Sequence, residues 1–154
     1  GEDRPPRTTV RLLGADDVVD LSGMLTGHDL ATLGAQAGAD LLVRLRTIEP
    51  PPVLKIRPIA NRTSMHVNRI YIIASLRAAI VGKGKARVVS GSGTGLAPTH
   101  IVSGALTSAS EKVGAEMVSM YQLSLDAVAV DSDAKVWAFT RRVKKVTPAP
   151  APSQ

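Results

Sequence analysis

Apolar residues recur at helical spacing in two segments of the first half of the chain. In residues 26–47 they lie three or four positions apart, and in residues 67–81 they form a second, wider stripe. This spacing is typical of helices that bury one face. Thr26 suits the N-cap of the first helix, with Asp29 three residues later. The prolines at 50–52 cannot continue that helix, so we predict that it ends before them.

Alternation of apolar and polar residues predicts strands in most of the remaining chain, because successive side chains of a strand point to opposite faces. The predicted strands are residues 53–60, 86–90, 100–106, 117–130 and 135–146. The last two form the clearest hairpin, with a turn at Asp131-Ser132-Asp133. Residues 91–98 are predicted as loop and residues 107–114 as turn. The order of elements predicts an α+β fold, with helices layered on one sheet.

A length of 154 residues is most simply one domain. The first 17 residues are charged and contain prolines without a period, so we predict a loose lead-in. Residues 148–154 are rich in proline and are predicted to be a disordered tail. The predicted domain therefore covers residues 18–147, which is long enough to build a core without a metal or a disulfide.

The composition narrows the classes of function. The chain has no cysteine, which excludes a disulfide framework, a cysteine-based zinc site and a thiol nucleophile. Its formal net charge is +6, which favours an acidic partner. Aromatic residues are only 3% of the sequence, which argues against binding of single-stranded nucleic acid by base stacking. No apolar run reaches the roughly 20 residues that a membrane-spanning helix needs.

No pattern for catalysis or cofactor binding survives inspection. The three histidines, His28, His66 and His100, are far apart and lack metal-ligand spacing. The glycine-rich GSGTG lacks the remaining residues of a nucleotide-binding loop, and Pro98 follows where a helix should begin. No G-x-S-x-G marks a nucleophile. We therefore expect no catalytic, cofactor-binding or metal-binding residues, and no enzyme.

A polar segment, NRTSMHVN, joins the strand at 53–60 to the second helix. Side-chain oxygens of Asn, Thr and Ser favour turns and helix starts, because they accept the unpaired N–H groups there. We predict a structural helix start formed by Asn61, Thr63 and Ser64, with Thr63 or Ser64 as the N-cap. The alternative is that Arg62 and His66 form a polar rim at which an anion docks.

The last predicted strand ends in four cations, Arg141, Arg142, Lys144 and Lys145. Alternation places the first and the last of them on one face with Trp137 and Phe139, and the middle two on the other face. These cations either protect the edge of a terminal strand from pairing or dock an acidic partner. Together with Arg62 and His66 they form the candidate partner surface. Trp137 is expected to pack against a helix.

Two stretches of the sequence resemble the LpoB-type family of periplasmic lipoproteins. The first is VLKIRPIANRTSMHVN, followed by an apolar helix and then GKGKARVVS; the second is YQLSLDAVAVDSDAKVWAFTRRVKKV. A weaker third match, VDLSGMLTGHD, has Met24 and Leu25 where the family usually has a Trp-Asn pair. Together the three cover most of residues 19–146 in the family's order.

The resemblance implies a small mixed sheet of about four to five strands backed by helices, similar to the N-terminal domain of TolB. It also implies a non-enzymatic activator of a bifunctional penicillin-binding protein. Such a domain works in the bacterial periplasm, tethered to the outer membrane through a lipid anchor that lies outside this chain. The expected partner is a cell-wall synthase or another envelope protein, with peptidoglycan as a further contact.

Two other functions stay open at this stage. On the same fold, the domain could be a structural, self-associating part of another envelope assembly. A basic nucleic-acid binder is less favoured, because stacking aromatics and recognition motifs are missing, so no nucleic-acid partner is expected. No cofactor is expected under any of these hypotheses.

Overall fold

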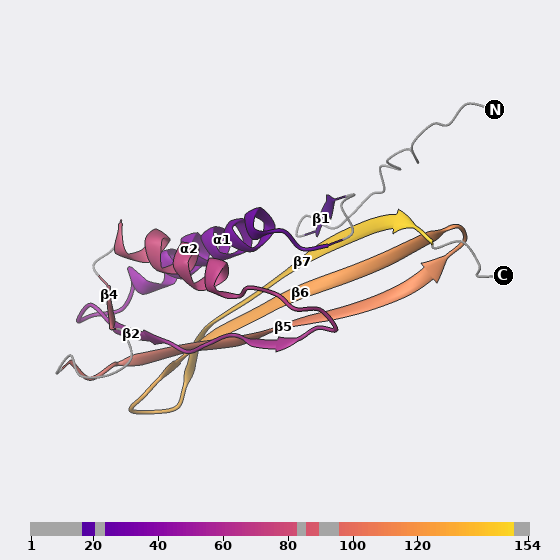
Figure 1. Ribbon diagram of the computed structural model, residues 1–154. Coiled ribbons are helices and arrows are strands. Elements are labelled where there is room, and N and C mark those ends of the chain that lie inside the picture. Colours follow the sequence, from indigo (N-terminus) through magenta and orange to yellow (C-terminus); the bar gives the residue numbers. More distant parts are fainter. Residues whose placement is uncertain (1–16, 21–23, 83–85, 90–95, 150–154) are drawn as a thin grey trace.

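The computed structural model describes residues 17–20, 24–82, 86–89 and 96–149. Two helices, α1 (Gly27–Leu45) and α2 (Ile70–Val81), lie side by side on one face of a mixed sheet. Within the described ranges, the opposite face of this sheet carries no helix (Figure 1). The predicted α+β class, with helices layered on one sheet, is confirmed.

The sheet contains seven strands in the described residues, in the order β1-β7-β6-β5-β2-β4, with β3 also pairing with β5. Their bounds are β1 Asp17–Asp20, β2 Val53–Ile56, β3 Ala60–Arg62, β4 Arg87–Val89, β5 His100–Val113, β6 Glu116–Ala129 and β7 Lys135–Pro148. The pairs β5–β6 and β6–β7 are antiparallel, whereas the other pairs are parallel. The count exceeds the predicted four to five because β1 and β3 are too short to show alternation.

Helix α1 begins as its sequence predicts. The Thr26 hydroxyl accepts a hydrogen bond from the Asp29 backbone at 3.1 Å, and the Asp29 carboxylate accepts one from the Thr26 backbone at 2.8 Å. This reciprocal arrangement satisfies two N–H groups of the first turn. The buried stripe of the helix is Leu30, Leu33, Ala37, Leu41 and Leu45, which is the stripe that the spacing predicts.

Two glycines of α1 allow the helices to pack closely. A Cβ at Gly34 would lie 2.3 Å from the backbone oxygen of Ile72, and a Cβ at Gly38 would lie 2.5 Å from the Cβ of Ala79. Glycine lowers the stability of an isolated helix, so neither residue is explained by helix propensity. Both are explained by the contact between α1 and α2.

Helix α2 starts later than predicted. Its N-cap is Arg69, which makes no side-chain capping hydrogen bond, so the prediction of Thr63 or Ser64 as the N-cap is wrong. Asn61 lies in β3, and its carboxamide oxygen accepts from the backbone and the hydroxyl of Thr63. The Asn61 amide group donates to the carbonyl of Met65 at 2.9 Å. These residues therefore stabilise a turn between β3 and the helix.

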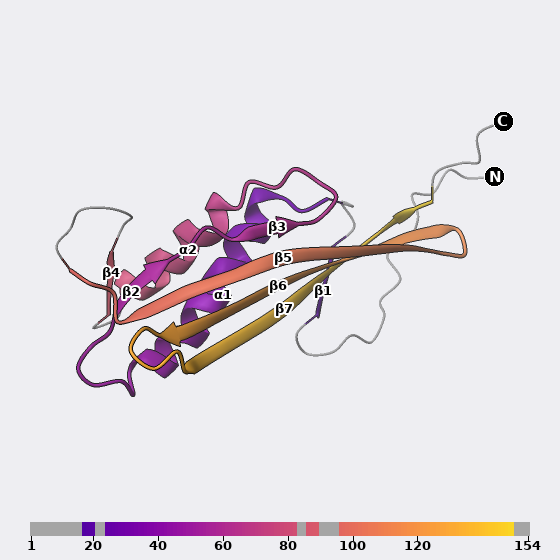
Figure 2. The same ribbon diagram turned by 90° about the horizontal axis from the view of Figure 1, so that it is seen from below.

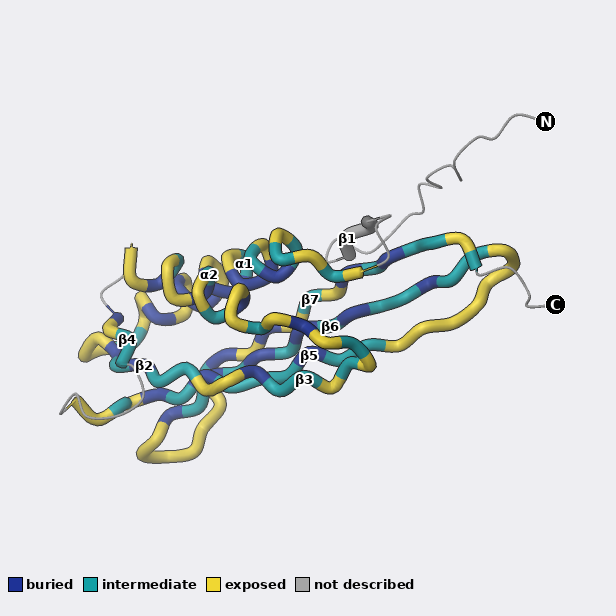
Figure 3. The backbone as a smooth tube through the Cα atoms, viewed as in Figure 1, coloured by how far each residue is buried: buried dark blue, intermediate teal, exposed yellow. Residues whose placement is uncertain are grey.

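Three strands of 14 residues each, β5, β6 and β7, extend beyond the ends of the helices (Figure 2). The predicted turn at 107–114 is wrong, because β5 continues to Val113 and pairs with β6 along this whole length. Apolar and polar residues do not alternate in residues 107–113, because the helices do not cover this part of the sheet and neither face of it needs to be apolar. The buried residues are concentrated under the helices, while the far end of β5 is exposed (Figure 3).

The hairpin turn agrees with its prediction, and the first and last strands each extend one residue beyond the predicted domain boundaries. The predicted hairpin turn is present, with Asp133 in the left-handed region at a φ of 57°. Asp17, placed in the lead-in by the sequence, is the first residue of β1, and Pro148, placed in the tail, is the last residue of β7. Most of the predicted loop at 91–98 lies outside the described residues.

Candidate protein-binding surface

The candidate partner surface is divided between the two faces of the sheet. Register and burial confirm that Arg141 and Lys145 share a face with Trp137 and Phe139, and this face is the one that the helices cover. Arg142 and Lys144 lie on the other face, which we call the open face. The two pairs of cations cannot therefore act as one patch.

Lys145 is the largest departure from the prediction. Its side chain has 0% exposure, and its ammonium group lies 2.8 Å from the Asp29 carboxylate in a buried ion pair. Since Asp29 also caps α1, this pair joins the start of the helix to β7. Lys145 is unavailable to a partner, so its assignment to a docking surface is wrong. Lys145 lies an even number of positions from Trp137 along the strand, which indicated that both face the helices. Burial was not expected, because a lysine is rarely buried unless it is paired.

The surroundings of this ion pair shift two pKa values. Burial acts to raise the pKa of Asp29, but hydrogen bonds from Lys145 and Thr26 outweigh it, so the pKa of this carboxyl is held below its usual range. Burial raises the pKa of Tyr121, which the charge of Lys145 only partly opposes. Both effects are expected where a cation and a hydroxyl share a poorly hydrated site.

Trp137 and Arg141 also belong to the layer between helix and sheet. The indole N–H of Trp137 donates to the Asp40 carboxylate on α1 at 2.8 Å, which confirms that this residue packs against a helix. The Arg141 guanidinium lies 5.1 Å from the ring centroid of Phe139, a distance suited to a cation–π contact. Neither residue is presented on the open face.

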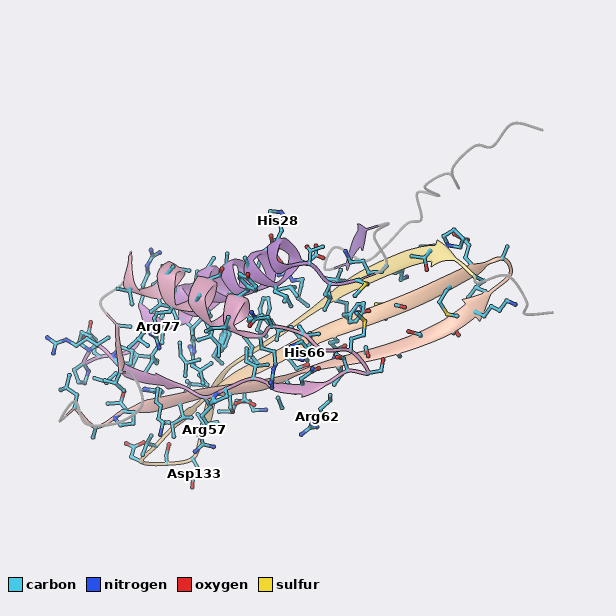
Figure 4. All side chains as sticks on the ribbon, in the orientation of Figure 1. His28, Arg57, Arg62, His66, Arg77 and Asp133 are labelled. Atoms are coloured by element: carbon cyan, nitrogen blue, oxygen red, sulfur yellow. The ribbon has the colours of Figure 1, made fainter. Side chains whose placement is uncertain are left out.

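Arg62 and His66 lie on different sides of the turn after β3 (Figure 4). Arg62 projects away from the helices and borders a hollow on the open face. His66 borders a separate hollow of about 300 Å³ beside the start of α2, together with Pro58, Asn68 and Ile70. The side chains of Arg62 and His66 therefore do not form one rim, and the docking of an anion between them is not supported by this arrangement.

The proposed protection of a free terminal edge does not fit the four cations either. Strand β1 pairs with β7 in parallel from Asp17↔Arg142 to Asp20↔Lys145, so this part of β7 has neighbours on both sides. Nearer its start, the Arg44 side chain of α1 donates to the carbonyl of Val136 at 2.8 Å. The edge of β7 is thus contacted at Val136 and paired from Arg142 to Lys145, which includes three of the four cations.

The histidines do not form a metal site. His100 is buried, and its Nδ1 lies 2.8 Å from the Thr99 hydroxyl. Among the described residues, no group of three or more histidine, cysteine or acidic side chains is arranged to hold a metal ion. Across the same residues, neither helix is long and apolar enough to span a membrane.

Comparisons with known proteins give a structural likeness only. No family model matches the sequence, and no curated protein matches it. The C-terminal domain of LpoB from Salmonella enterica has a TM-score of 0.55 at 15% identity, and covers 75% of this chain and 98% of that domain. The C-terminal domain of LpoB from Escherichia coli has a TM-score of 0.51 at 14% identity, with the same coverage. The chain therefore has an LpoB-like fold.

Proposed function

We propose that this domain is a non-enzymatic regulator that binds a bifunctional penicillin-binding protein and raises its rate of glycan synthesis. The main support for the proposal is the LpoB-like fold. The structural match covers 98% of the LpoB C-terminal domain in both comparisons. The motif NRTSMHVN and the closing hairpin support it at the level of the sequence. The domain would act in the periplasm, held at the outer membrane by a lipid anchor outside this chain.

The mechanism would be a shift in population of the synthase. An activator raises activity only if it binds the active conformation of its target more tightly than the resting one. A tenfold preference corresponds to about 1.4 kcal/mol of differential binding, which a small interface can supply. No chemical step is then required of this chain.

The experiment that tests this proposal is a glycan-polymerisation assay with a bifunctional synthase from the same cell. Lipid-linked precursor is supplied, and the rate is measured with and without the purified domain. We expect a faster rate that saturates as the domain is added, and no consumption of precursor by the domain alone. An unchanged rate, together with no binding to the synthase in calorimetry, would contradict the proposal.

A structural role is the second candidate, and the outer edge of β5 favours it. Strand β3 pairs with β5 only up to Thr107, and no other described strand lies beside residues 108–113 on that side. Unpaired strand edges are templates for pairing with another chain. Light scattering over a range of concentrations separates the two roles, since self-association predicts a rising mass and the regulator predicts a monomer.

A further inference from the structure

The open face of the sheet contains a shallow trough. It is a hollow of about 430 Å³ that crosses β3, β5, β6 and β7. Its floor is formed by six small or polar residues: Ser103, Ala105, Ser124, Asp126, Ala138 and Thr140. Arg62 stands at one end and Lys135 at the other. Both helices lie on the other side of the sheet from Arg62 (Figure 4).

The register of the strands explains why the surface is hollow here. Ser103, Asp126 and Ala138 form one row across the sheet, and Ala105, Ser124 and Thr140 form the next. The row beyond them contains Gln122 and Arg142, which are much longer. Two rows of short side chains beside a row of long ones leave a depression across the strands.

The floor of the trough is rich in hydrogen-bonding groups. Ser103 donates to the Asp126 carboxylate at 3.4 Å, and the Ser124 hydroxyl accepts from the Gln122 amide at 3.1 Å. Thr140 is exposed. The side chains of Leu125 and Phe139, which also border the hollow, are buried in the core. The floor therefore offers hydroxyls and the methyl groups of two alanines rather than aromatic contacts.

The charge in the trough is positive. Its carboxylate, Asp126, lies 3.7 Å from the Lys135 ammonium group and is largely balanced by it. Arg62 is exposed and forms no ion pair with any residue that the structure describes. Lys55 and Arg87 occupy open-face positions on β2 and β4, while Lys144 lies near Glu111 at the far end of the sheet.

We propose that the trough binds an extended, acidic segment of a protein partner. Positive charge at both ends selects acidic side chains, and the hydroxyls can pair with the backbone of an extended chain. The missing aromatic surface disfavours single-stranded nucleic acid, which needs stacking platforms. This inference rests on the proposed function, because it assumes a protein partner and specifies the chemistry of the segment that it presents.

The geometry also sets the length of this segment. Arg62 is level with Thr107 and Lys135 with Val128, which pairs with Ile101. The two cations are therefore separated by about 20 Å along the strands and about 14 Å across them. An extended chain covers that diagonal with about seven residues. The segment should have acidic residues about eight positions apart, which places both on the same side of an extended chain, with small polar residues between them.

A defined peptide tests the proposal directly. The probe is a nine-residue peptide with Glu at each end and Ser and Thr between, and the matched control peptide has Gln in place of both Glu. Each is titrated into the isotopically labelled domain at physiological salt and followed by NMR. We expect shifts at the amides of Ser103, Ser124 and Thr140 with the acidic peptide. Shifts confined to the helices, or equal binding of the control peptide, would overturn the proposal.

Matched variants distinguish binding of the peptide in the trough from non-specific attraction between the peptide and a basic protein. Arg62→Ala should weaken peptide binding about tenfold, whereas Arg77→Ala, which removes one charge from an exposed position on α2, should leave it unchanged. Ala138→Leu fills the trough without changing charge and should also weaken binding, while Ala109→Leu on the same face outside it should not. An equal loss in R62A and R77A would overturn the proposal.

The synthase assay distinguishes failure of this inference from failure of the proposed function. If wild-type domain stimulates the synthase and A138L stimulates it equally well, the trough is not the partner site although the function stands. If the peptide binds in the trough while wild-type domain leaves the synthase rate unchanged, the proposed function fails and the preference for acidic segments remains. Binding of anionic lipid vesicles through Arg62, without binding of the peptide, would overturn the inference.

Discussion

The two faces of the sheet use the same residue types for opposite purposes. Lys144 and Lys145 are neighbours in β7, yet Lys144 lies on the open face while Lys145 is fully buried against the start of α1. Arg141 and Arg142 are divided in the same way. Since strands alternate, the position of a cation along β7 decides its environment. The face under the helices contains the core, and the open face carries no helix among the described elements.

Lys145→Ala removes the buried cation of β7 and has the largest expected effect on stability. We expect a loss of about 2–5 kcal/mol in the free energy of unfolding, because removal of the fully buried Lys145 side chain leaves a cavity and takes the ion-pair partner from the largely covered Asp29 carboxylate. Chemical denaturation followed by circular dichroism measures it. The matched control is Lys144→Ala, which should change stability by no more than about 0.5 kcal/mol. Equal effects of the two substitutions would show that the ion pair is not a structural tie.

The second test uses neighbouring residues of β6. Leu125→Ala should cost about 2–5 kcal/mol of unfolding free energy, since it leaves a cavity in the core beneath the helices. Ser124→Ala, on the open face, should change stability by less than about 0.5 kcal/mol. Thermal and urea unfolding of the two variants provide the comparison. A large loss for Ser124→Ala would mean that the open face is structural as well.

The third test concerns the contact between the two helices. In an isolated helix Gly34→Ala would be stabilising by about 0.5–1 kcal/mol. Here the new Cβ would clash with the backbone of Ile72, so we expect the opposite sign and a loss of about 1–3 kcal/mol. Thr32→Ala, at an exposed position of the same helix, is the control and should be close to neutral. Stabilisation by Gly34→Ala would contradict the close packing.

The smallest expected effect is the pH-dependent part of the Asp29 contribution, which changes only in the acidic range. The pKa of Asp29 is lower in the folded state than its ordinary value of about 4. Its contribution to stability is therefore present above about pH 4 and is lost as the pH falls through the folded-state pKa. The advantage of the wild-type domain over Asp29→Asn should shrink on acidification from pH 6 to pH 2, as measured by urea unfolding. A difference that stays constant over this range would contradict the assignment.

The sequence correctly predicted the features that depend on residues close together in the chain. Thr26 and Asp29 mark the start of α1, and the Asp-Ser-Asp turn marks the hairpin between β6 and β7. Alternation predicted the division of Arg141 and Arg142 between two faces. These features depend on residues close together in the chain, so they are readable without the fold.

The errors occurred where distant segments decide the structure. Residues 107–113 look like a turn because they are polar, but pairing with β6 keeps them extended. Lys145 looks like a surface cation because Asp29, its partner, is 116 positions away in the sequence. Gly34 and Gly38 look like weak points of a helix because the surface of α2 that they fit is not visible from α1 alone. The trough could not be predicted either, since four strands form it.

The order of helices and strands along the chain has a consequence for folding. Both helices are synthesised before β5, β6 and β7, yet their apolar stripes are buried on those strands. A growing chain that ends before β6 would carry two exposed apolar helices and no sheet to receive them. The closing β5–β6–β7 meander is built from contacts between neighbouring strands, which form quickly once the strands exist. The strands that receive both helices are therefore synthesised last, and an unfinished chain exposes apolar surface of the kind that favours aggregation.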